Sequence, residues 1–335
     1  MNKPQIALAL SAMLTVCTVL PRSVHADDAN TPPVSAAAAK WNHQQDVVYG
    51  YKNGMALVLD VFSPKNPRNG AAVLRLMSGG MVSSPMWSHG APNDRAEVRE
   101  LLESGYVVFA VAHSCQPKYT IDEIIPDVYR AVRFIRHNAV RFGINPQRIG
   151  IMGASSGGHL SLLTATAAPA AKPEATDPVD RESSRVQAAV AYYPGTDNLN
   201  FGRENVTILQ HFRAQGEESL AATFDFHQWD DKVKRFERVT DPDLIRELFR
   251  KTSPITHVNA DTAPVLILHG DQDKLVPLQQ SDVFLARLTE VGIANERVTI
   301  PGVGHGFSNG REKPMQGEIP AILDWFGRHL AENRR

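Results

Sequence analysis

Short, continuously apolar segments alternate with amphipathic segments along most of this 335-residue chain. Segments such as 106–112 (Y-V-V-F-A-V-A) lack a polar face, so they fit strands buried on both sides of a parallel sheet. Segments such as 121–142 carry an apolar stripe at helical spacing, so they fit helices packed on that sheet. The alternation predicts an α/β fold with a mostly parallel central sheet and helices on both faces. The expected strands are 72–76, 106–112, 148–152, 188–193, 265–269 and 297–300, and the expected helices are 94–102, 121–142, 157–168, 278–291 and 319–330.

Two regions depart from this alternation. Segments 47–51 and 55–62 fit a β-hairpin, with Lys52-Asn53-Gly54 as the turn. Residues 196–252 contain charged and aromatic helical segments and no convincing strand, although they lie between two core strands. We therefore expect this segment to be a helical cap insertion over the carboxyl edge of the sheet, which is the edge where α/β sheets bind ligands.

The N-terminus has the features of a secretory signal peptide. Lys3 precedes the mostly apolar run 6–20, and Val24-His25-Ala26 fits a small-residue cleavage site. The run is shorter than the roughly 20 residues of a membrane-spanning helix, which favours cleavage after Ala26 over an uncleaved anchor. We expect an exported protein, periplasmic or extracellular, with no stable membrane insertion after cleavage. The expected division is a signal peptide at 1–26, a flexible leader at 27–40 and a single α/β domain at 41–335.

Charge and cysteine content narrow the function classes. The formal net charge is -1 at pH 7, so no basic excess favours binding to nucleic acid or an anionic membrane. Cleavage would remove Cys17 and leave Cys115 without a disulfide partner. Nothing in the sequence around Cys115 supplies an activating base, so we expect a packing or loop role for it. The chain has no H-E-x-x-H, no paired cysteines and no P-loop, so we expect neither a metal nor a cofactor.

The segment 149–160 reads I-G-I-M-G-A-S-S-G-G-H-L and joins an expected strand to an expected helix. Residues 153–157 fit the pattern G-x-S-x-G. A sharp strand-to-helix turn forces its central residue into a sparsely populated backbone conformation, and glycines at the flanking positions avoid collisions. Ser155 stands between Gly153 and Gly157, whereas Ser156 would need Ala154 in place of the first glycine. We therefore predict that Ser155, and not Ser156, is a nucleophile.

A serine hydroxyl needs a histidine to take its proton and an acid to hold that histidine. The expected strand 265–269 ends in Gly270-Asp271-Gln272-Asp273, and the expected strand 297–300 ends in Pro301-Gly302-Val303-Gly304-His305. Both segments follow the carboxyl ends of strands, and so lie on the same edge as Ser155. We therefore expect His305 to be the base, with the acid at Asp271 or Asp273.

These motifs resemble those of α/β-hydrolases of the acetyl esterase/lipase and feruloyl-esterase-like kind, which are related to the catalytic domain of prolyl-oligopeptidase-type peptidases. The matching motifs are G-A-S-S-G-G-H-L, S-P-I-T-H-V, H-G-D-Q-D-K-L-V-P and P-G-V-G-H-G-F. The resemblance implies a catalytic triad of Ser155, His305 and Asp273, with Asp271 in reserve. It also implies that His159 and His269 are structural residues.

The sequence departs from the family at the expected oxyanion hole. The family pattern after the third strand is H-G-G-G, whose backbone N–H groups point at the developing oxyanion. Residues 77–81 read M-S-G-G-M, so the histidine is absent while two glycines remain. A backbone donor needs no side chain. We therefore expect the Ser156 N–H and the N–H of Gly79 or Gly80 to form the hole.

The best-supported function is hydrolysis of carboxylic esters through an acyl-enzyme. The resemblance implies short acyl groups of the acetyl or feruloyl type, carried by a small molecule or a glycan. A prolyl-oligopeptidase-type peptidase is disfavoured because only a short segment precedes the first expected strand. A non-catalytic binding protein is disfavoured because all triad residues are present, and a long-chain lipase because the insertion is strongly charged. For Phe224, Phe226 and Trp229 of the insertion we expect buried packing. The sequence indicates no oligomeric state.

Overall fold

The computed structural model describes residues 40–65, 68–307 and 318–332. The expected signal peptide at 1–26 and nearly all of the expected leader lie outside these residues. Within them, no helix is long and apolar enough to cross a membrane.

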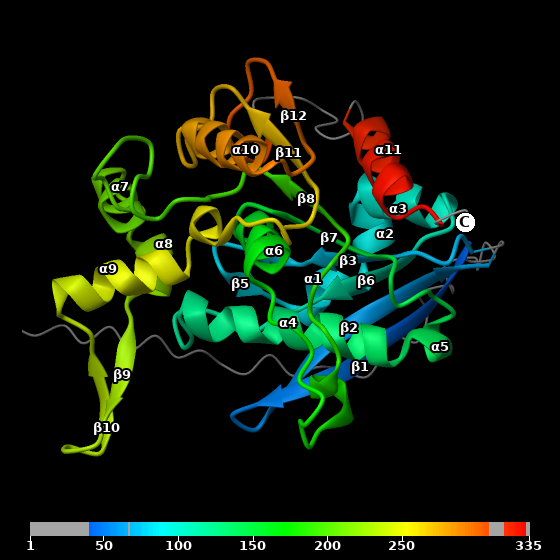
Figure 1. Ribbon diagram of the computed structural model, residues 1–335, viewed down its shortest axis with the longest axis horizontal. Coiled ribbons are helices and arrows are strands. Elements are labelled where there is room, and N and C mark those ends of the chain that lie inside the picture. Colours follow the sequence, from blue (N-terminus) through cyan, green and yellow to red (C-terminus); the bar gives the residue numbers. More distant parts are fainter. Residues whose placement is uncertain (1–39, 66–67, 308–317, 333–335) are drawn as a thin grey trace, which may run out of the picture. The chain divides into compact units, whose positions relative to one another are not determined.

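The core of the described chain is an eight-stranded sheet (Figure 1). In spatial order its strands are β1 (Trp41–Lys52), β2 (Met55–Pro64), β6 (Val107–Val111), β3 (Ala72–Leu76), β7 (Ile149–Ala154), β8 (Ala188–Tyr192), β11 (Val265–Gly270) and β12 (Asn295–Ile300). The β1–β2 and β2–β6 pairs are antiparallel, and every later pair is parallel. The predicted mostly parallel sheet is confirmed.

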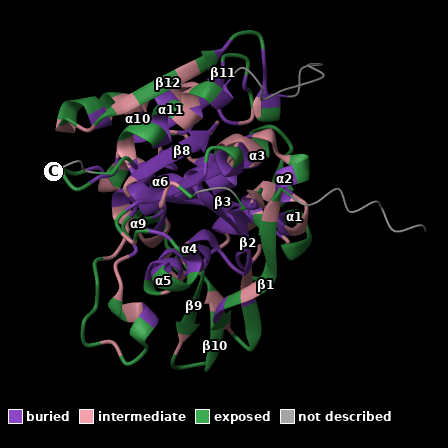
Figure 2. Ribbon diagram, turned by 90° about the vertical axis from the view of Figure 1, so that its right-hand side faces the viewer, coloured by how far each residue is buried: buried purple, intermediate pink, exposed green. Residues whose placement is uncertain are grey.

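Two hydrophobic clusters fill the two faces of this sheet. Successive residues of a strand point to opposite faces. Leu74 and Ile151 accordingly belong to one cluster, and their neighbours Val73 and Met152 belong to the other. The first lies under α4 (Ile121–His137), α6 (Ser156–Ala167) and α10 (Gln279–Val291), and the second under α3 (Ala96–Glu103) and α11 (Ile319–His329). Buried residues accordingly gather along the central strands (Figure 2).

Several predicted elements have different ends in the structure. The first hairpin strand begins at Trp41, well before the predicted start, because its exposed residues lack the apolar alternation of a strand. The predicted helix 94–102 is two helices, α2 (Ala91–Asp94) and α3, separated by Arg95 in an extended conformation. The predicted helix 121–142 is α4 followed by α5 (Ala139–Phe142), with Gly143 in the left-handed conformation at its end.

The insertion of residues 196–252 contains helices, as predicted, but also an unpredicted β-hairpin. Its strands β9 (His227–Asp230) and β10 (Arg235–Arg238) are almost entirely exposed, so they carry no buried alternating face that a sequence pattern would reveal. Phe224 and Phe226 are buried, as predicted, whereas half of the Trp229 surface is exposed. The helices are α7 (Ile208–Ala214), α8 (Glu218–Ala221) and α9 (Pro242–Lys251).

Candidate active site

A sharp turn between β7 and α6 holds Ser155 at the carboxyl edge of the sheet. Ser155 has a φ of 53°, in a region that side-chain-bearing residues rarely adopt. Its N–H donates to the Tyr192 carbonyl at 2.9 Å, which fixes the strained residue against the neighbouring strand. A Cβ at Gly153 would lie 2.3 Å from the carbonyl group of Gly157, so the turn requires glycine there. The sequence pattern therefore reflects a real steric constraint.

The structure brings Ser155, His305 and Asp273 together in one chain of hydrogen bonds. The distance from Ser155 Oγ to His305 Nε2 is 2.9 Å, and that from His305 Nδ1 to Asp273 Oδ2 is 2.8 Å. The three residues follow β7, β12 and β11, so the parallel sheet places them at one edge. An imidazole between a hydroxyl and a carboxylate is the arrangement that activates a serine for attack on a carbonyl carbon.

Asp273 is built to remain ionised. Its side chain is fully buried, and its Oδ1 accepts the Val276 N–H at 2.9 Å. Burial by itself would raise the pKa of Asp273, but hydrogen bonds from His269 and His305, and from Val276, lower that pKa to about 2. His269 Nε2 lies 3.4 Å from Oδ2. The carboxylate is therefore charged at neutral pH.

Asp271, the reserve acid, has a different position. It is exposed, and its Oδ1 accepts the Gly302 N–H at 2.8 Å, so it ties together the two loops that carry Asp273 and His305. The Nδ1 atom of His305 lies at hydrogen-bonding distance from Asp273 instead. The geometry therefore favours Asp273 as the partner of the imidazole.

Gly79, Gly80 and Ser156 all line the cavity next to Ser155. Gly79 belongs to β4 (Ser78–Gly79), which pairs with β5 (Val82–Ser83) in a tight hairpin. Gly80 has a φ of 57°, which favours glycine. Ser78 Oγ lies 2.9 Å from Ser156 Oγ, so Ser78 links this hairpin to the first residue of α6. The expected donors are thus gathered at one place, beside the positive end of a helix.

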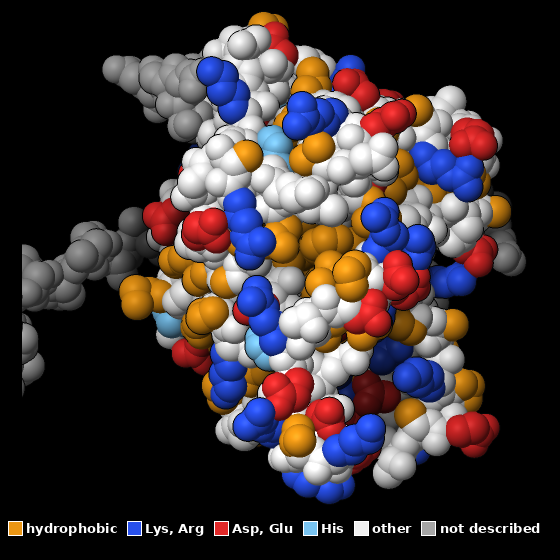
Figure 3. All heavy atoms as spheres, turned by 90° about the vertical axis from the view of Figure 1, so that its left-hand side faces the viewer, with side chains coloured by type: hydrophobic (Ala, Val, Ile, Leu, Met, Phe, Trp, Pro, Cys, Tyr) orange, Lys and Arg blue, Asp and Glu red, His pale blue; other side chains and the backbone are white. Residues whose placement is uncertain are grey.

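The cavity over Ser155 has a volume of about 400 Å³. The apolar side chains that line it come mainly from the insertion and from the loop after β11. Arg95, which precedes α3, and Tyr193, which follows β8, also line the cavity. On the face that carries the insertion, hydrophobic side chains reach the surface between charged ones (Figure 3). Apolar lining residues are Phe201, Ile208, Phe212, Leu220, Phe224, Leu275 and Val276. The site thus combines a serine hydrogen-bonded to a histidine with a largely apolar cavity, as expected for a small-molecule site.

Comparison with known proteins shows the family of the chain. The BD-FAE family model matches residues 59–288, which is more than half of the chain. The chain belongs to the BD-FAE family. Esterase LipC of Mycobacterium tuberculosis is 30% identical over 311 residues, which cover 90% of this chain and 70% of LipC. Esterase LipQ of the same organism is 28% identical, with 89% and 65% covered.

Solved structures show the same fold. A truncated carbohydrate esterase from gut microbiota superposes with a TM-score of 0.65 at 22% identity, covering 88% of this chain and 98% of that one. This BD-FAE family member therefore has the α/β-hydrolase fold, and the chain is a carboxylesterase, as the sequence predicted.

His159, expected to be structural, fastens the insertion of this esterase to α6. Its Nδ1 lies 3.0 Å from the Gly195 carbonyl, and its Nε2 lies 2.8 Å from the Thr252 carbonyl. These carbonyls belong to the residues at the two ends of the insertion. Asn198 also donates to the Thr252 carbonyl at 3.1 Å. The buried His159 side chain thus connects both ends of the insertion with α6, the helix that follows the turn of Ser155.

The loop of Gly79 and Gly80 is supported from behind by residues 113–117. The Gln116 side chain donates to the Gly80 carbonyl at 3.0 Å and to the Ser219 carbonyl of α8 at 2.9 Å. Cys115 is half-buried and packs against the backbone of Ser83, and burial raises the pKa of its thiol. These contacts fit the expected loop role of Cys115.

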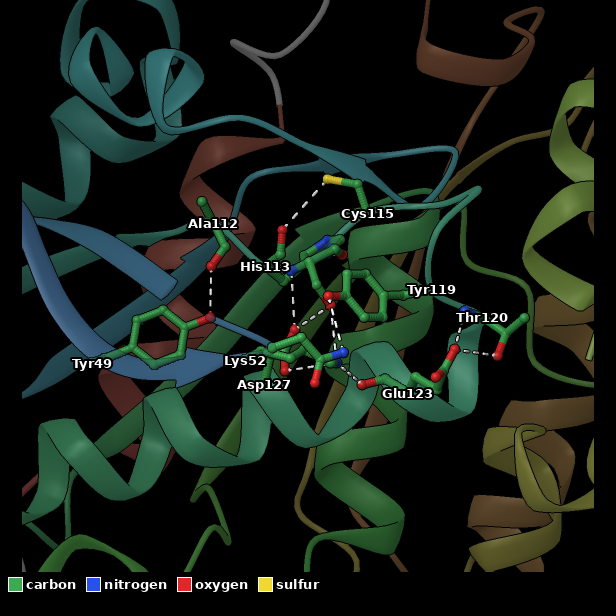
Figure 4. Close-up of polar contacts among 11 residues, drawn as sticks. Tyr49, Lys52, Ala112, His113, Cys115, Tyr119, Thr120, Glu123 and Asp127 are labelled. Atoms are coloured by element: carbon green, nitrogen blue, oxygen red, sulfur yellow. Dashed lines mark hydrogen bonds and ion pairs between the residues drawn. The ribbon is translucent and has the colours of Figure 1, made fainter. Parts of the chain in front are cut away.

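A buried ionic network anchors this supporting loop to α4 (Figure 4). Lys52 Nζ lies 3.0 Å from Asp127 Oδ1 and 3.1 Å from Ser114 Oγ. The other carboxylate oxygen of Asp127 accepts the Ser114 N–H at 3.0 Å and the Ser114 hydroxyl at 2.5 Å. Because each charge is paired inside the protein, the loop has a defined conformation.

Sequence reasoning missed two residues of the site, Tyr193 and Arg95. Tyr193 stacks edge-on against the His305 ring at 4.6 Å between centroids and has a φ of 37°. Arg95 lines the cavity. His269, which was expected to be structural, lies next to the Asp273 carboxylate. Tyr193 follows β8 at the carboxyl edge, which is the signal that could have identified it. Arg95 lies within the predicted helix 94–102, so its position at a helix break was hidden.

One group of side chains outside the cavity has the composition of a metal site. Donor atoms of Asp46, Asp60 and His89 lie within 4.8 Å of one another. Asp60 is buried and contacts His43 Nε2 at 2.6 Å, and its other oxygen accepts the Asp46 N–H at 3.0 Å. His89 Nε2 lies 3.2 Å from Asp46 Oδ1. These internal contacts join β1, β2 and the short helix α1 (Pro85–His89).

Proposed function

We propose that this esterase cleaves its substrate by acyl transfer to Ser155. The observation that carries the proposal is the continuous hydrogen-bonded chain from Asp273 through His305 to Ser155. The ionised Asp273 accepts the Nδ1–H of His305, which leaves the Nε2 lone pair to accept the serine proton. Ser155 Oγ then attacks the ester carbon, and His305 returns the proton to the leaving alcohol. Water, deprotonated by His305, hydrolyses the acyl-enzyme in the second half of the reaction.

The developing oxyanion is stabilised by backbone donors in this proposal. Ser156 N–H lies at the N-terminus of α6, where unpaired N–H groups and the helix dipole favour negative charge. The Gly79 or Gly80 N–H supplies the second donor from the opposite loop. Preorganised donors of this kind lower the barrier because charge forms at the position they already face. The 2.9 Å contact between Ser78 and Ser156 supports a fixed distance between the two halves of the hole.

We propose short acyl esters, of the acetyl or feruloyl type, as substrates. The cavity of about 400 Å³ has an apolar wall that suits a small acyl or aromatic group. One structural neighbour is a carbohydrate esterase from gut microbiota, so esters of glycans belong in the first substrate panel.

The experiment compares 4-nitrophenyl acetate, butyrate, octanoate and palmitate, with purified residues 27–335 and the Ser155→Ala variant. The proposal predicts the highest kcat/KM on the shortest chains and no catalysed turnover by the variant. Undiminished hydrolysis by Ser155→Ala would reject Ser155 as the nucleophile. A maximum at palmitate would reject the short-acyl preference and leave the nucleophile in place.

We propose that the protein is exported and that its signal peptide ends at Ala26. The charge, apolar run and cleavage motif at the N-terminus support this. Mass spectrometry of the protein purified from a periplasmic or culture fraction is expected to give an N-terminus at Asp27. An intact N-terminus in the cytoplasmic fraction alone would contradict export.

A further inference from the structure

The cavity over Ser155 contains a cationic side chain that ester hydrolysis itself does not need. Arg95 lines the cavity together with Ser155 and His305. It is the N-cap residue of α3, where its extended backbone separates α3 from α2. Its Nε is buried and has no hydrogen-bond acceptor among the described residues. Leaving a buried charged donor unpaired costs more than leaving a neutral one unpaired, so this position needs an explanation.

Of the two acidic residues near Arg95 in sequence, Asp94 is exposed and Glu97 is already engaged. Glu97 Oε1 accepts a hydrogen bond from Arg75 Nε at 3.1 Å, and both side chains are almost completely buried. Within residues 40–65, 68–307 and 318–332, Arg95 forms no ion pair with a carboxylate. The charge of Arg75, followed by burial, lowers the pKa of Arg95. The only carboxylate on this helix close to both arginines is thus paired with Arg75, and a ligand could balance the charge of Arg95.

The Arg95 guanidinium lies on a different wall of the cavity from most of the apolar side chains that line the cavity. Phe201, Phe212 and Phe224 come from the insertion, whereas Arg95 comes from the α2–α3 junction on the other side of α6 (Figure 1). No Asp or Glu belongs to the described residues that line the cavity. Ser155 stands between a cationic wall and an apolar wall. A substrate that matches both walls would carry a negative group on one side of the ester and an apolar group on the other.

We propose that Arg95 binds a carboxylate of the substrate, so that the preferred substrates are esters with an anionic group on one side and an apolar group on the other. This inference rests on the proposed function, because it places the scissile ester at Ser155. A guanidinium matches a carboxylate with two parallel hydrogen bonds, and such charge-assisted pairs are stronger than neutral ones. The pairing would also compensate the desolvation of Arg95. Tyr193 also lines the cavity.

Matched esters that differ in one charge test the proposal. On the alcohol side, 4-acetoxybenzoate is compared with the neutral 4-acetoxybenzamide; on the acyl side, 4-nitrophenyl hemisuccinate is compared with 4-nitrophenyl pentanoate. The quantity measured is the ratio of kcat/KM for the anionic and neutral members, in wild type, Arg95→Gln and Arg95→Lys. We expect Arg95→Gln to lower that ratio about tenfold to hundredfold in one of the pairs, as for a lost hydrogen bond between charged groups. Arg95→Lys should retain part of the preference for the anionic ester, because lysine keeps the positive charge.

Arg99→Gln is the matched control, because it removes the same charge from the same helix outside the cavity. Its ratio should equal that of wild type. The pair in which the ratio falls identifies the half of the ester that carries the anion. Equal ratios in wild type and Arg95→Gln for both pairs would overturn the proposal, provided that wild type hydrolyses the neutral esters. A wild-type protein that hydrolyses none of the four esters would instead count against the proposed function. If Arg95→Gln does not fold, Arg95→Lys and salt replace it. The proposal then predicts that the ratio of kcat/KM for anionic and neutral esters falls in Arg95→Lys and falls in wild type as the salt concentration rises. An unchanged ratio in both measurements would overturn it.

Discussion

The central sheet and the insertion of residues 196–252 hold their parts of the active site by different means. The sheet positions Ser155 and Asp273 through the buried strands β7 and β11, and His305 through the neighbouring edge strand β12, which is partly exposed. The insertion supplies much of the apolar wall, and it joins the rest through core side chains such as Phe201 and Phe249 and through polar contacts of His159, Gln116 and Gln280. We conclude that changes in the sheet should affect the chemistry and the fold, and that changes at the insertion should affect substrate binding.

The largest effect is expected from Asp273→Asn at the sheet edge. Loss of the carboxylate removes both the orientation of His305 and the stabilisation of its protonated form, so kcat should fall by about 10⁴. Asp271→Asn is the control on the same loop and should lose far less, because Asp271 bonds Gly302 instead of His305. Steady-state kinetics on 4-nitrophenyl acetate measure both. Equal losses in the two variants would show that the acid is not correctly assigned.

The next effect in size concerns the turn that carries Ser155. A methyl group at Gly153 would lie 2.3 Å from the Gly157 carbonyl, and backbone cannot move aside as a flexible side chain can. We expect Gly153→Ala to lower the free energy of unfolding by about 3 kcal/mol, as in overpacked cores. In Gly327→Ala, on α11, the added Cβ has nothing within 4 Å. Urea unfolding of this pair would contradict the account if Gly153→Ala were as stable as Gly327→Ala.

A smaller effect, on the pH dependence of the free energy of unfolding, is expected from His159, which connects α6 to the insertion. Burial lowers the pKa of His159 to about 4, against the opposing effect of hydrogen bonds to the Thr252 and Gly195 carbonyls, whereas an unfolded histidine has a pKa of about 6.5. Between these values the unfolded chain binds a proton that the folded protein does not, so stability falls as the pH falls through this window. From pH 7 to pH 5 the contribution is on the order of 2 kcal/mol.

His159→Gln removes this contribution, so its free energy of unfolding should fall less between pH 7 and pH 5 than that of wild type. His257→Gln, which changes a more exposed histidine near the same insertion, should behave as wild type. A free energy of unfolding that falls more between pH 7 and pH 5 in His159→Gln than in wild type would contradict the account, because it would mean that His159 is protonated between its two carbonyl acceptors.

The smallest effect is expected from Gln116→Ala, which cuts the link between the Gly80 loop and the insertion. Each lost hydrogen bond contributes about 1 kcal/mol, so KM should rise several-fold while kcat changes less. Gln272→Ala, an exposed glutamine outside the cavity, should leave both constants unchanged. A fall in kcat as large as that of Asp273→Asn would show that the insertion also sets the chemistry, and the contrast between the two regions would fail.

The difference between the central sheet and the insertion also explains which parts of the structure the sequence could predict. Continuous apolar runs predict the buried strands, and the steric demand at Gly153 and Gly157 marks the turn at Ser155. Hairpin β9–β10 is exposed and carries no such pattern, so the sequence does not predict it. Arg95 was hidden because the break between α2 and α3 has no proline or glycine at that residue. Polar cross-links such as Gln116 to Ser219 depend on tertiary packing, which short-range patterns do not encode.

The most direct test of the account is the site of covalent labelling by a fluorophosphonate, which reacts with activated serines. After treatment and proteolysis, mass spectrometry should find one adduct, on Ser155, and none in the His305→Ala variant, because the imidazole that activates the hydroxyl is gone. An adduct on Ser156, or labelling that does not depend on His305, would contradict the assignment of Ser155 as the activated nucleophile.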